Sequence, residues 1–268
     1  MTLTADLVAR VNHAVAHPGP DPDFIPNTEE DHAVAVREML ASHREGEDVW
    51  LFAYGSLLWR PAVEHVEERM GTARGWHRSF GLRLRAWRGT REQPGLMMGL
   101  DRGGQCKGVV YRLAGHSVEV ELCKLFRREM PVRPLNKPPT NIPRWLTVET
   151  DRGRLRAIAF VIDRRGYAYA GRLTPEQTAD ILATACGHGG SCAEYLYNTV
   201  SHLEERGIRD RNLWRLQALV ADRIASLTAP AGVKETCLGS LESCPRARSG
   251  GVRPARPPWS KRSAKRCV

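Results

Sequence analysis

Two short stretches of the sequence carry residue types that could do chemistry. The first, FAYGSLLWRP, runs from Phe52 to Pro61, and it interrupts an apolar run with Tyr54, Gly55 and Ser56. A glycine and a serine at the end of a buried strand form either a tight structural turn or a loop whose backbone N–H groups bind an anion. The residue types alone leave both interpretations open.

The second stretch, SVEVELCKLFRREMP, places a carboxylate on a face that should be buried. Helical spacing gathers three apolar side chains on that face: Val118, Leu122 and Leu125. The next position on the same face is Glu129, just before a proline. A buried carboxylate either pairs with an arginine or keeps a raised pKa for chemistry. Arg127 and Arg128 are adjacent, but consecutive side chains point apart on a helix. The spacing alone therefore favours a structural salt bridge, with a catalytic acid as the alternative.

Other chemical motifs are weaker. Ser56 lacks the G-x-S-x-G pattern of a serine hydrolase, and the stretch RGGQCKG lacks the spacing of a phosphate-binding loop. Cys186, His188 and Cys192 match no common zinc motif, so no metal site is expected. Tyr169 and Tyr195 read as half-buried aromatic residues that could also line a polar pocket.

The elements that must position these residues alternate between strands and helices. Short strands are expected over residues 49–54, 72–87, 95–100, 106–113, 145–150 and 155–162. Turn residues predict hairpins at Asp101–Gly104 and Asp151–Gly153, and DPDFIPN reads as a linker. Helices are expected over 4–11, 28–43 and 117–130 and after Thr174, Ser191 and Asp210. This pattern predicts an α+β protein with a small, mixed, mainly antiparallel β-barrel flanked by helices.

Charge and composition divide the 268 residues into three regions. Residues 1–47 form a helical extension, 48–227 the main domain, and 228–268 a basic tail. The tail holds nine lysines and arginines against two acids, which accounts for +7 of the net charge of +10. It is rich in proline, glycine and serine, so we expect it to be disordered and to bind polyanions weakly at most. No specific nucleic-acid binding is expected, because the remaining residues are nearly balanced in charge.

Hydropathy and cysteine spacing argue against several classes of protein. No apolar stretch approaches the roughly 20 residues of a membrane span, and residues 1–17 lack the apolar core of a secretory signal. The seven cysteines are odd in number and widely spaced, which favours free thiols in a reducing compartment. We therefore expect a cytoplasmic protein without a membrane partner.

Taken together, the motifs resemble those of the ChaC-type, glutathione-specific γ-glutamylcyclotransferases. VWLFAYGSLLW is followed by LFRREM, and ARGWHRSF, YAGRL and CAEYLYNTVSHLEERG recur in the family's order over residues 48–224. The resemblance implies a γ-glutamylcyclotransferase-like barrel. It also implies a cofactor-free lyase reaction that cleaves glutathione to 5-oxoproline and Cys-Gly. One departure is Ala53, where many members of the family have glycine.

The resemblance also assigns roles to residues. The catalytic acid of the family falls on Glu129, which makes this carboxylate the general base. The substrate-binding loop falls on Tyr54, Gly55, Ser56, Leu57 and Leu58. Tyr169 and Tyr195 are further candidates for substrate contacts. Two alternatives remain: a cyclotransferase for other γ-glutamyl compounds, and a non-enzymatic basic regulator that binds through its tail.

Overall fold

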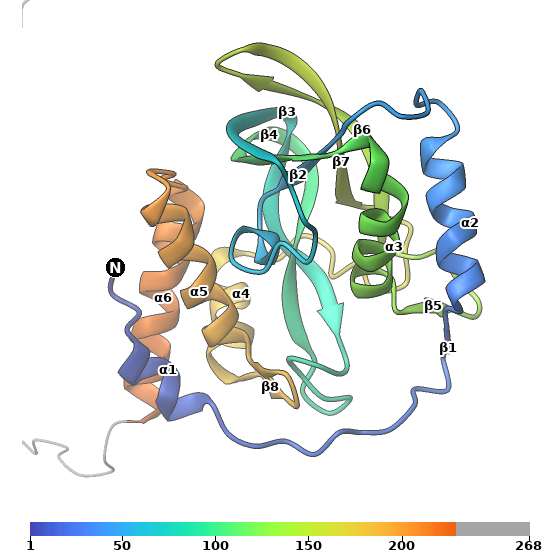
Figure 1. Ribbon diagram of the computed structural model, residues 1–268. Coiled ribbons are helices and arrows are strands. Elements are labelled where there is room, and N and C mark those ends of the chain that lie inside the picture. Colours follow the sequence, from blue (N-terminus) through green and yellow to red (C-terminus); the bar gives the residue numbers. More distant parts are fainter. Residues whose placement is uncertain (229–268) are drawn as a thin grey trace, which may run out of the picture. The chain divides into compact units, whose positions relative to one another are not determined.

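A closed barrel of five strands forms the centre of the protein (Figure 1). The computed structural model describes residues 1–228, so the predictions for the basic tail lie outside the described residues from position 229 onward. The strands follow the order β2-β4-β3-β6-β7 around the barrel. Their bounds are Val49–Ala53 for β2, Glu67–Leu84 for β3, Gly95–Leu113 for β4, Asn141–Thr150 for β6 and Gly153–Ile162 for β7.

The barrel is mainly antiparallel and closes through a parallel pair. β2 lies antiparallel to β4 on one side and parallel to β7 on the other, with Trp50 opposite Ala157. Four of the five residues of β2 are buried, and Leu51, Phe52 and Ala53 are inaccessible to solvent. The predicted α+β class and small mixed barrel are confirmed.

The predicted hairpin at Asp101–Gly104 is wrong, because β4 runs through these residues without reversing. β3 and β4 instead pair as one long ribbon, with a register shift between Arg74 and Trp76. Three glycines near the shift adopt positive φ angles: 79° at Gly75, 111° at Gly103 and 66° at Gly104. They form an irregularity inside the ribbon, where the sequence pattern had indicated a turn. The second predicted hairpin is confirmed, because Thr150 of β6 pairs with Gly153 of β7.

Six helices surround the barrel in the described part of the chain. They are α1 (Ala5–Val11), α2 (Glu29–Leu40), α3 (Val118–Glu129), α4 (Pro175–Thr184), α5 (Cys192–Glu205) and α6 (Arg211–Leu227). In Figure 1, α1, α4, α5 and α6 gather on one side of the barrel, and α2 and α3 cover the other. The expected helix starts are confirmed, because these N-cap side chains accept hydrogen bonds from backbone N–H groups: Thr4, Thr28, Thr174, Ser191 and Asp210.

Short elements complete the described chain. The predicted linker DPDFIPN contains a strand, β1 (Phe24–Pro26), which pairs with β5 (Val132–Pro134). The linker prediction missed this strand because a two-stranded pairing between distant segments leaves no local periodicity. The remaining short elements are the 3₁₀ turns η1 (Ser56–Leu58) and η2 (Gly115–Ser117) and the strands β8 (Cys186–Gly187) and β9 (Gly190–Ser191).

Two general properties follow from the described residues. None of the helices between residues 1 and 228 has the length and apolar character that crossing a membrane requires. The four described cysteines, Cys106, Cys123, Cys186 and Cys192, are free thiols.

Candidate active site

A small cavity of about 30 Å³ brings most of the sequence-predicted site residues together. It is lined by Tyr54, Gly55, Ser56, Leu57, Leu82, Met97, Met98, Glu129, Asn141, Phe160 and Tyr195. Leu58 belongs to the same loop but is packed in the core, at 2% exposure, and does not line the cavity. Tyr169 lines a different, larger cavity, which shares no lining residue with this one.

The loop after β2 is held in place by a buried arginine. The Arg78 side chain on β3 is 1% exposed, and its Nε donates a 2.7 Å hydrogen bond to the Tyr54 carbonyl. The same guanidinium pairs with the Asp210 carboxylate at 3.2 Å. The Tyr54 hydroxyl donates to the Phe160 carbonyl at 2.7 Å. A charge-assisted bond in a buried setting is strong, so Arg78 fixes the position of the loop on the barrel.

Gly55 is placed where a side chain would collide. Its φ of −133° lies outside the left-handed region. A Cβ atom at this position would lie 3.0 Å from the hydroxyl oxygen of Tyr195. The close approach of Tyr195 to the backbone therefore accounts for the glycine.

The loop offers backbone donors to the cavity. The Gly55 carbonyl accepts from Leu58 N–H, and the Ser56 carbonyl accepts from Arg60 N–H, each at 2.9 Å. Within residues 1–228, the backbone N–H groups of Gly55 and Leu57 have no hydrogen-bond acceptor. Such unengaged donors at the start of a helical turn can bind a carboxylate or a developing oxyanion.

Glu129 ends α3 and turns its carboxyl into this cavity. The helix is anchored by the buried side chains of Leu122, Leu125 and Phe126, and the Phe126 ring packs against that of Phe160. The Glu129 side chain is 17% exposed. Burial raises the pKa of its carboxyl above the usual 4.5, while the charge of Arg128 and a hydrogen bond from Asn141 work in the opposite direction.

The prediction that the side chains of Arg128 and Glu129 point apart is wrong. The Arg128 Nε lies 3.4 Å from the Glu129 Oε1, because both side chains turn toward the loop after β2. The Arg128 Nη2 donates to the Ser56 hydroxyl at 3.0 Å, and its Nη1 donates to the Arg60 carbonyl. Glu129 therefore forms a salt bridge with Arg128 and also lines the cavity.

Two tyrosines flank the carboxyl and stay protonated. Burial, followed by the negative charge of Glu129, raises the pKa of Tyr195 to about 12. The same two causes raise the pKa of Tyr54 well above 10. Both phenols are therefore neutral near pH 7. The Tyr195 hydroxyl is available as a hydrogen-bond donor inside the cavity, whereas that of Tyr54 is engaged by Phe160.

Sequence reasoning missed several residues of this cavity. Asn141 opens β6 and provides the hydrogen bond to Glu129, and Met97 and Met98 of β4 supply apolar lining. Nothing in the local sequence marks these residues, because only the barrel pairing brings β4 and β6 beside the end of α3. The alternating sequence pattern of a strand likewise does not predict that Arg78 is buried.

The cysteine cluster near α5 has a structural explanation. The Cys192 thiol at the start of α5 donates to the Arg88 carbonyl at 3.0 Å, and Cys186 is buried at the start of β8. In the described chain, no group of three His, Cys, Asp or Glu side chains is arranged to hold a metal ion. The small cavity at Glu129 can support proton transfer by the carboxyl of this residue. Backbone N–H groups of the loop can stabilise a negative charge that develops there.

Comparisons with known proteins identify relatives of this chain. Residues 49–223 match the family model described as ChaC-like protein. The chain is 38% identical to the glutathione-specific gamma-glutamylcyclotransferase of Escherichia coli (strain K12), over 76% of this chain and 86% of that protein. It is 30% identical to glutathione-specific gamma-glutamylcyclotransferase 1 of Homo sapiens, over 58% and 70%.

A solved structure supports the fold. The yeast gamma-glutamyl cyclotransferase specific to glutathione superposes with a TM-score of 0.59 at 19% identity, covering 65% of this chain and 96% of that chain. At this identity the likeness concerns the arrangement of the barrel and its helices.

Proposed function

Because the chain belongs to the ChaC-like protein family, we propose that it is a glutathione-specific γ-glutamylcyclotransferase. It acts as a lyase that cleaves the γ-glutamyl bond of glutathione and releases 5-oxoproline and Cys-Gly. The observation that carries the proposal is that the Glu129 carboxyl shares one cavity with the loop Tyr54–Leu57.

The reaction needs a base, and Glu129 is placed to supply it. The α-amine of the glutamyl residue is protonated at neutral pH, so it must lose a proton before it can attack. The Glu129 carboxylate takes this proton, and the neutral amine attacks the γ-carbonyl carbon of the same residue. The five-membered ring closes, and the protonated Glu129 carboxyl gives its proton to the cysteine nitrogen as the bond to that nitrogen breaks. The ring nitrogen still carries two hydrogens, and it passes one of them through the Glu129 carboxylate to the freed amine, which leaves the lactam of 5-oxoproline and the ammonium form of Cys-Gly.

The remaining lining residues position the substrate and stabilise charge. The N–H groups of Gly55 and Leu57 donate to the substrate carboxylate or to the oxyanion formed during attack. The Tyr195 hydroxyl is a further donor, and Tyr54 and Ser56 shape the wall. Holding the glutamyl chain curled supplies much of the rate, because the attack is intramolecular. The raised pKa of Glu129 makes it a better base than an ordinary glutamate.

A cyclotransferase for other γ-glutamyl compounds is the second candidate. The cavity of about 30 Å³ admits only a few atoms, so most of a glutathione molecule, including its whole Cys-Gly half, must lie outside it. Recognition of that half would have to come from residues outside the cavity. Comparing turnover of glutathione with that of γ-glutamyl-alanine separates the two candidates.

The decisive experiment incubates the purified full-length protein with glutathione and follows 5-oxoproline and Cys-Gly by mass spectrometry. We expect both products in equal amounts without an added cofactor. If neither product forms while the protein is folded, the proposed function is refuted. We further propose that residues 48–227 carry the activity.

A further inference from the structure

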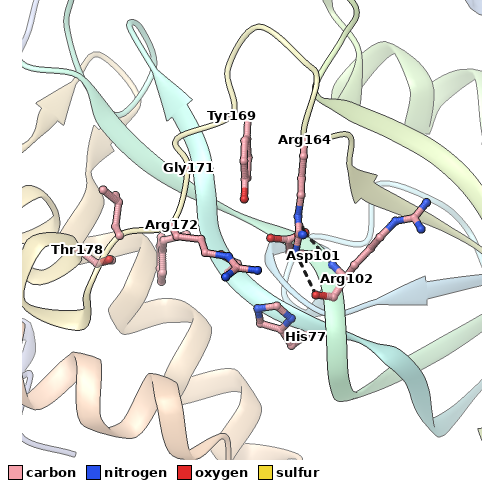
Figure 2. Close-up of a pocket in the computed structure, with 11 residues that line it drawn as sticks. His77, Asp101, Arg102, Arg164, Tyr169, Gly171, Arg172 and Thr178 are labelled. Carbon is pink, nitrogen blue, oxygen red and sulfur yellow. Dashed lines mark hydrogen bonds and ion pairs between the residues drawn. The ribbon is translucent and has the colours of Figure 1, made fainter.

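A second cavity, larger than the one at Glu129, lies apart from that residue and has a volume of about 390 Å³ (Figure 2). Its walls come from β3, β4, the segment after β7 and α4. The lining residues are His77, Ser79, Phe80, Asp101, Arg102, Arg164, Tyr169, Gly171, Arg172, Leu173 and Thr178. This volume falls in the ~300–1,000 Å³ range that is typical of small-molecule sites.

The cavity carries a surplus of positive charge. Three arginines line it, and Asp101 is the only acid among the lining residues. The Asp101 Oδ1 pairs with the Arg164 Nε at 2.9 Å and accepts from the Arg102 N–H at 2.7 Å. Arg172 forms no ion pair with any residue of the range 1–228. In Figure 2 the Arg102 guanidinium points away from the Asp101–Arg164 pair, so one acid faces the two guanidinium groups of Arg164 and Arg172, and one positive charge is left for an anionic ligand to balance.

Several donors converge on the interior. In Figure 2, the Arg172 guanidinium, the Tyr169 hydroxyl and the His77 ring point toward the Asp101–Arg164 pair. The Arg164 Nη2 donates to the Arg102 carbonyl at 3.2 Å, which fixes this guanidinium in place. The His77 Nδ1 lies 3.1 Å from the Gly103 carbonyl. A carbonyl only accepts, so Nδ1 carries a proton and Nε2 remains for a ligand.

We propose that this cavity binds a small molecule through an anionic phosphate group, with Arg164, Arg172 and Tyr169 as its donors. Guanidinium forks match phosphate oxygens in pairs, and the negative charge of a phosphate group offsets the surplus positive charge. The volume exceeds what a free phosphate ion needs, so an organic phosphate ester is the class of ligand. The site is separate from the proposed reaction, because the two cavities share no lining residue.

The cavity nevertheless borders the active site through one wall. The Phe80 ring lines the larger cavity and packs edge-on against Tyr195, with the centroids 6.2 Å apart. The backbone of Tyr169 forms an isolated β-bridge with that of Leu82, and Leu82 lines the smaller cavity. A ligand in the larger cavity is therefore one side chain away from the glutamyl site without occupying it.

The test is calorimetric titration of the full-length protein with glycerol 3-phosphate at low ionic strength. We expect binding that weakens at least tenfold in Arg172→Gln and in Arg164→Gln. The matched control is Arg165→Gln, because Arg165 is the neighbour of Arg164 but pairs with Asp163 outside the cavity. Affinity should be unchanged in this control. Equal losses in all three variants would show diffuse attraction by positive charge and would overturn the proposal.

Further arms identify the ligand class and keep this site distinct from the proposed function. Inorganic phosphate should bind more weakly than glycerol 3-phosphate, and succinate more weakly still; tighter binding of succinate would overturn the assignment to phosphate. Saturating glutathione should leave the affinity for glycerol 3-phosphate unchanged, whereas competition would make this cavity part of the substrate site. Arg172→Gln should keep normal glutathione turnover, so the two proposals fail independently.

Discussion

The Nε atom of Arg128 lies 3.4 Å from Oε1 of Glu129, so neighbouring residues form an ion pair at the edge of the proposed active site. The guanidinium also binds Ser56, which joins the end of α3 to the loop after β2. Burial raises the pKa of Glu129, and this positive charge partly offsets the effect. In the proposed mechanism, the balance between these two effects sets the pH at which Glu129 becomes active as a base.

Replacing Arg128 should shift the pH dependence of catalysis. A general base works as the carboxylate, so kcat/KM rises with pH and levels off above the pKa of Glu129. Arg128→Met removes the charge that lowers this pKa, and the acidic limb of the profile should move to higher pH. Arg127→Met is the control, because Arg127 pairs with the exposed Glu29. An unshifted limb in Arg128→Met would contradict the role of this ion pair.

Replacing Glu129 should abolish most of the activity. Glu129→Gln keeps the shape of the side chain and removes the proton acceptor, and loss of a general base typically costs ~10²–10⁴ in rate. Glu119→Gln, on the exposed face of the same helix, should turn over glutathione normally. The measurement is 5-oxoproline release under saturating glutathione. A folded Glu129→Gln variant with near wild-type turnover would remove Glu129 from the mechanism.

The same substitution should stabilise the protein at neutral pH. The pKa of Glu129 is higher in the folded state than in the unfolded chain, so ionisation opposes folding and stability from this group falls as pH rises through that pKa. Glu129→Gln should therefore have a higher Tm than the wild type near pH 7. The difference should shrink below pH 4.5, where the wild-type carboxyl is neutral in both states. Thermal melts across this range check the sign, and a constant difference would count against it.

Adding one methyl group at Gly55 should weaken substrate binding. In Gly55→Ala, the new Cβ would meet the Tyr195 hydroxyl at 3.0 Å and push the loop or the tyrosine aside. We expect a raised KM that is partly restored in the double variant Gly55→Ala/Tyr195→Phe, which lacks that hydroxyl. Ser56→Ala should cost less than Gly55→Val, because the backbone supplies the proposed donors. Strictly additive effects of Gly55→Ala and Tyr195→Phe would argue against the contact.

Removing the basic tail should leave catalysis intact. The last described helix, α6, ends at Leu227. The Thr228 N–H caps this helix by donating to the Ile224 carbonyl. Truncation after Thr228 should therefore preserve glutathione turnover, as the composition of the tail predicts. A fall in Tm of more than about 5 °C, which for this size means over 1 kcal/mol, would show that the tail packs on the domain.

The sequence by itself determined the local elements and the face on which Glu129 lies. Helix starts such as Thr28 and Thr174 were predictable, because an N-cap depends only on residues within one turn. The apolar periodicity of α3 likewise placed Glu129 toward the core, and the turn at Asp151–Gly153 follows from local backbone preferences. The catalytic interpretation of Glu129, in contrast, came from the resemblance to a family.

Tertiary structure alone decided which of these residues meet. Barrel closure pairs Trp50 with Ala157, and only this long-range pairing brings the loop after β2 and Asn141 of β6 beside Glu129. It also sends Tyr169 to a separate cavity and makes Gly103 part of a continuous strand. The physical reason is that strand register and the burial of long side chains such as Arg78 depend on contacts between segments far apart in the chain, which leave no periodic trace in the local sequence.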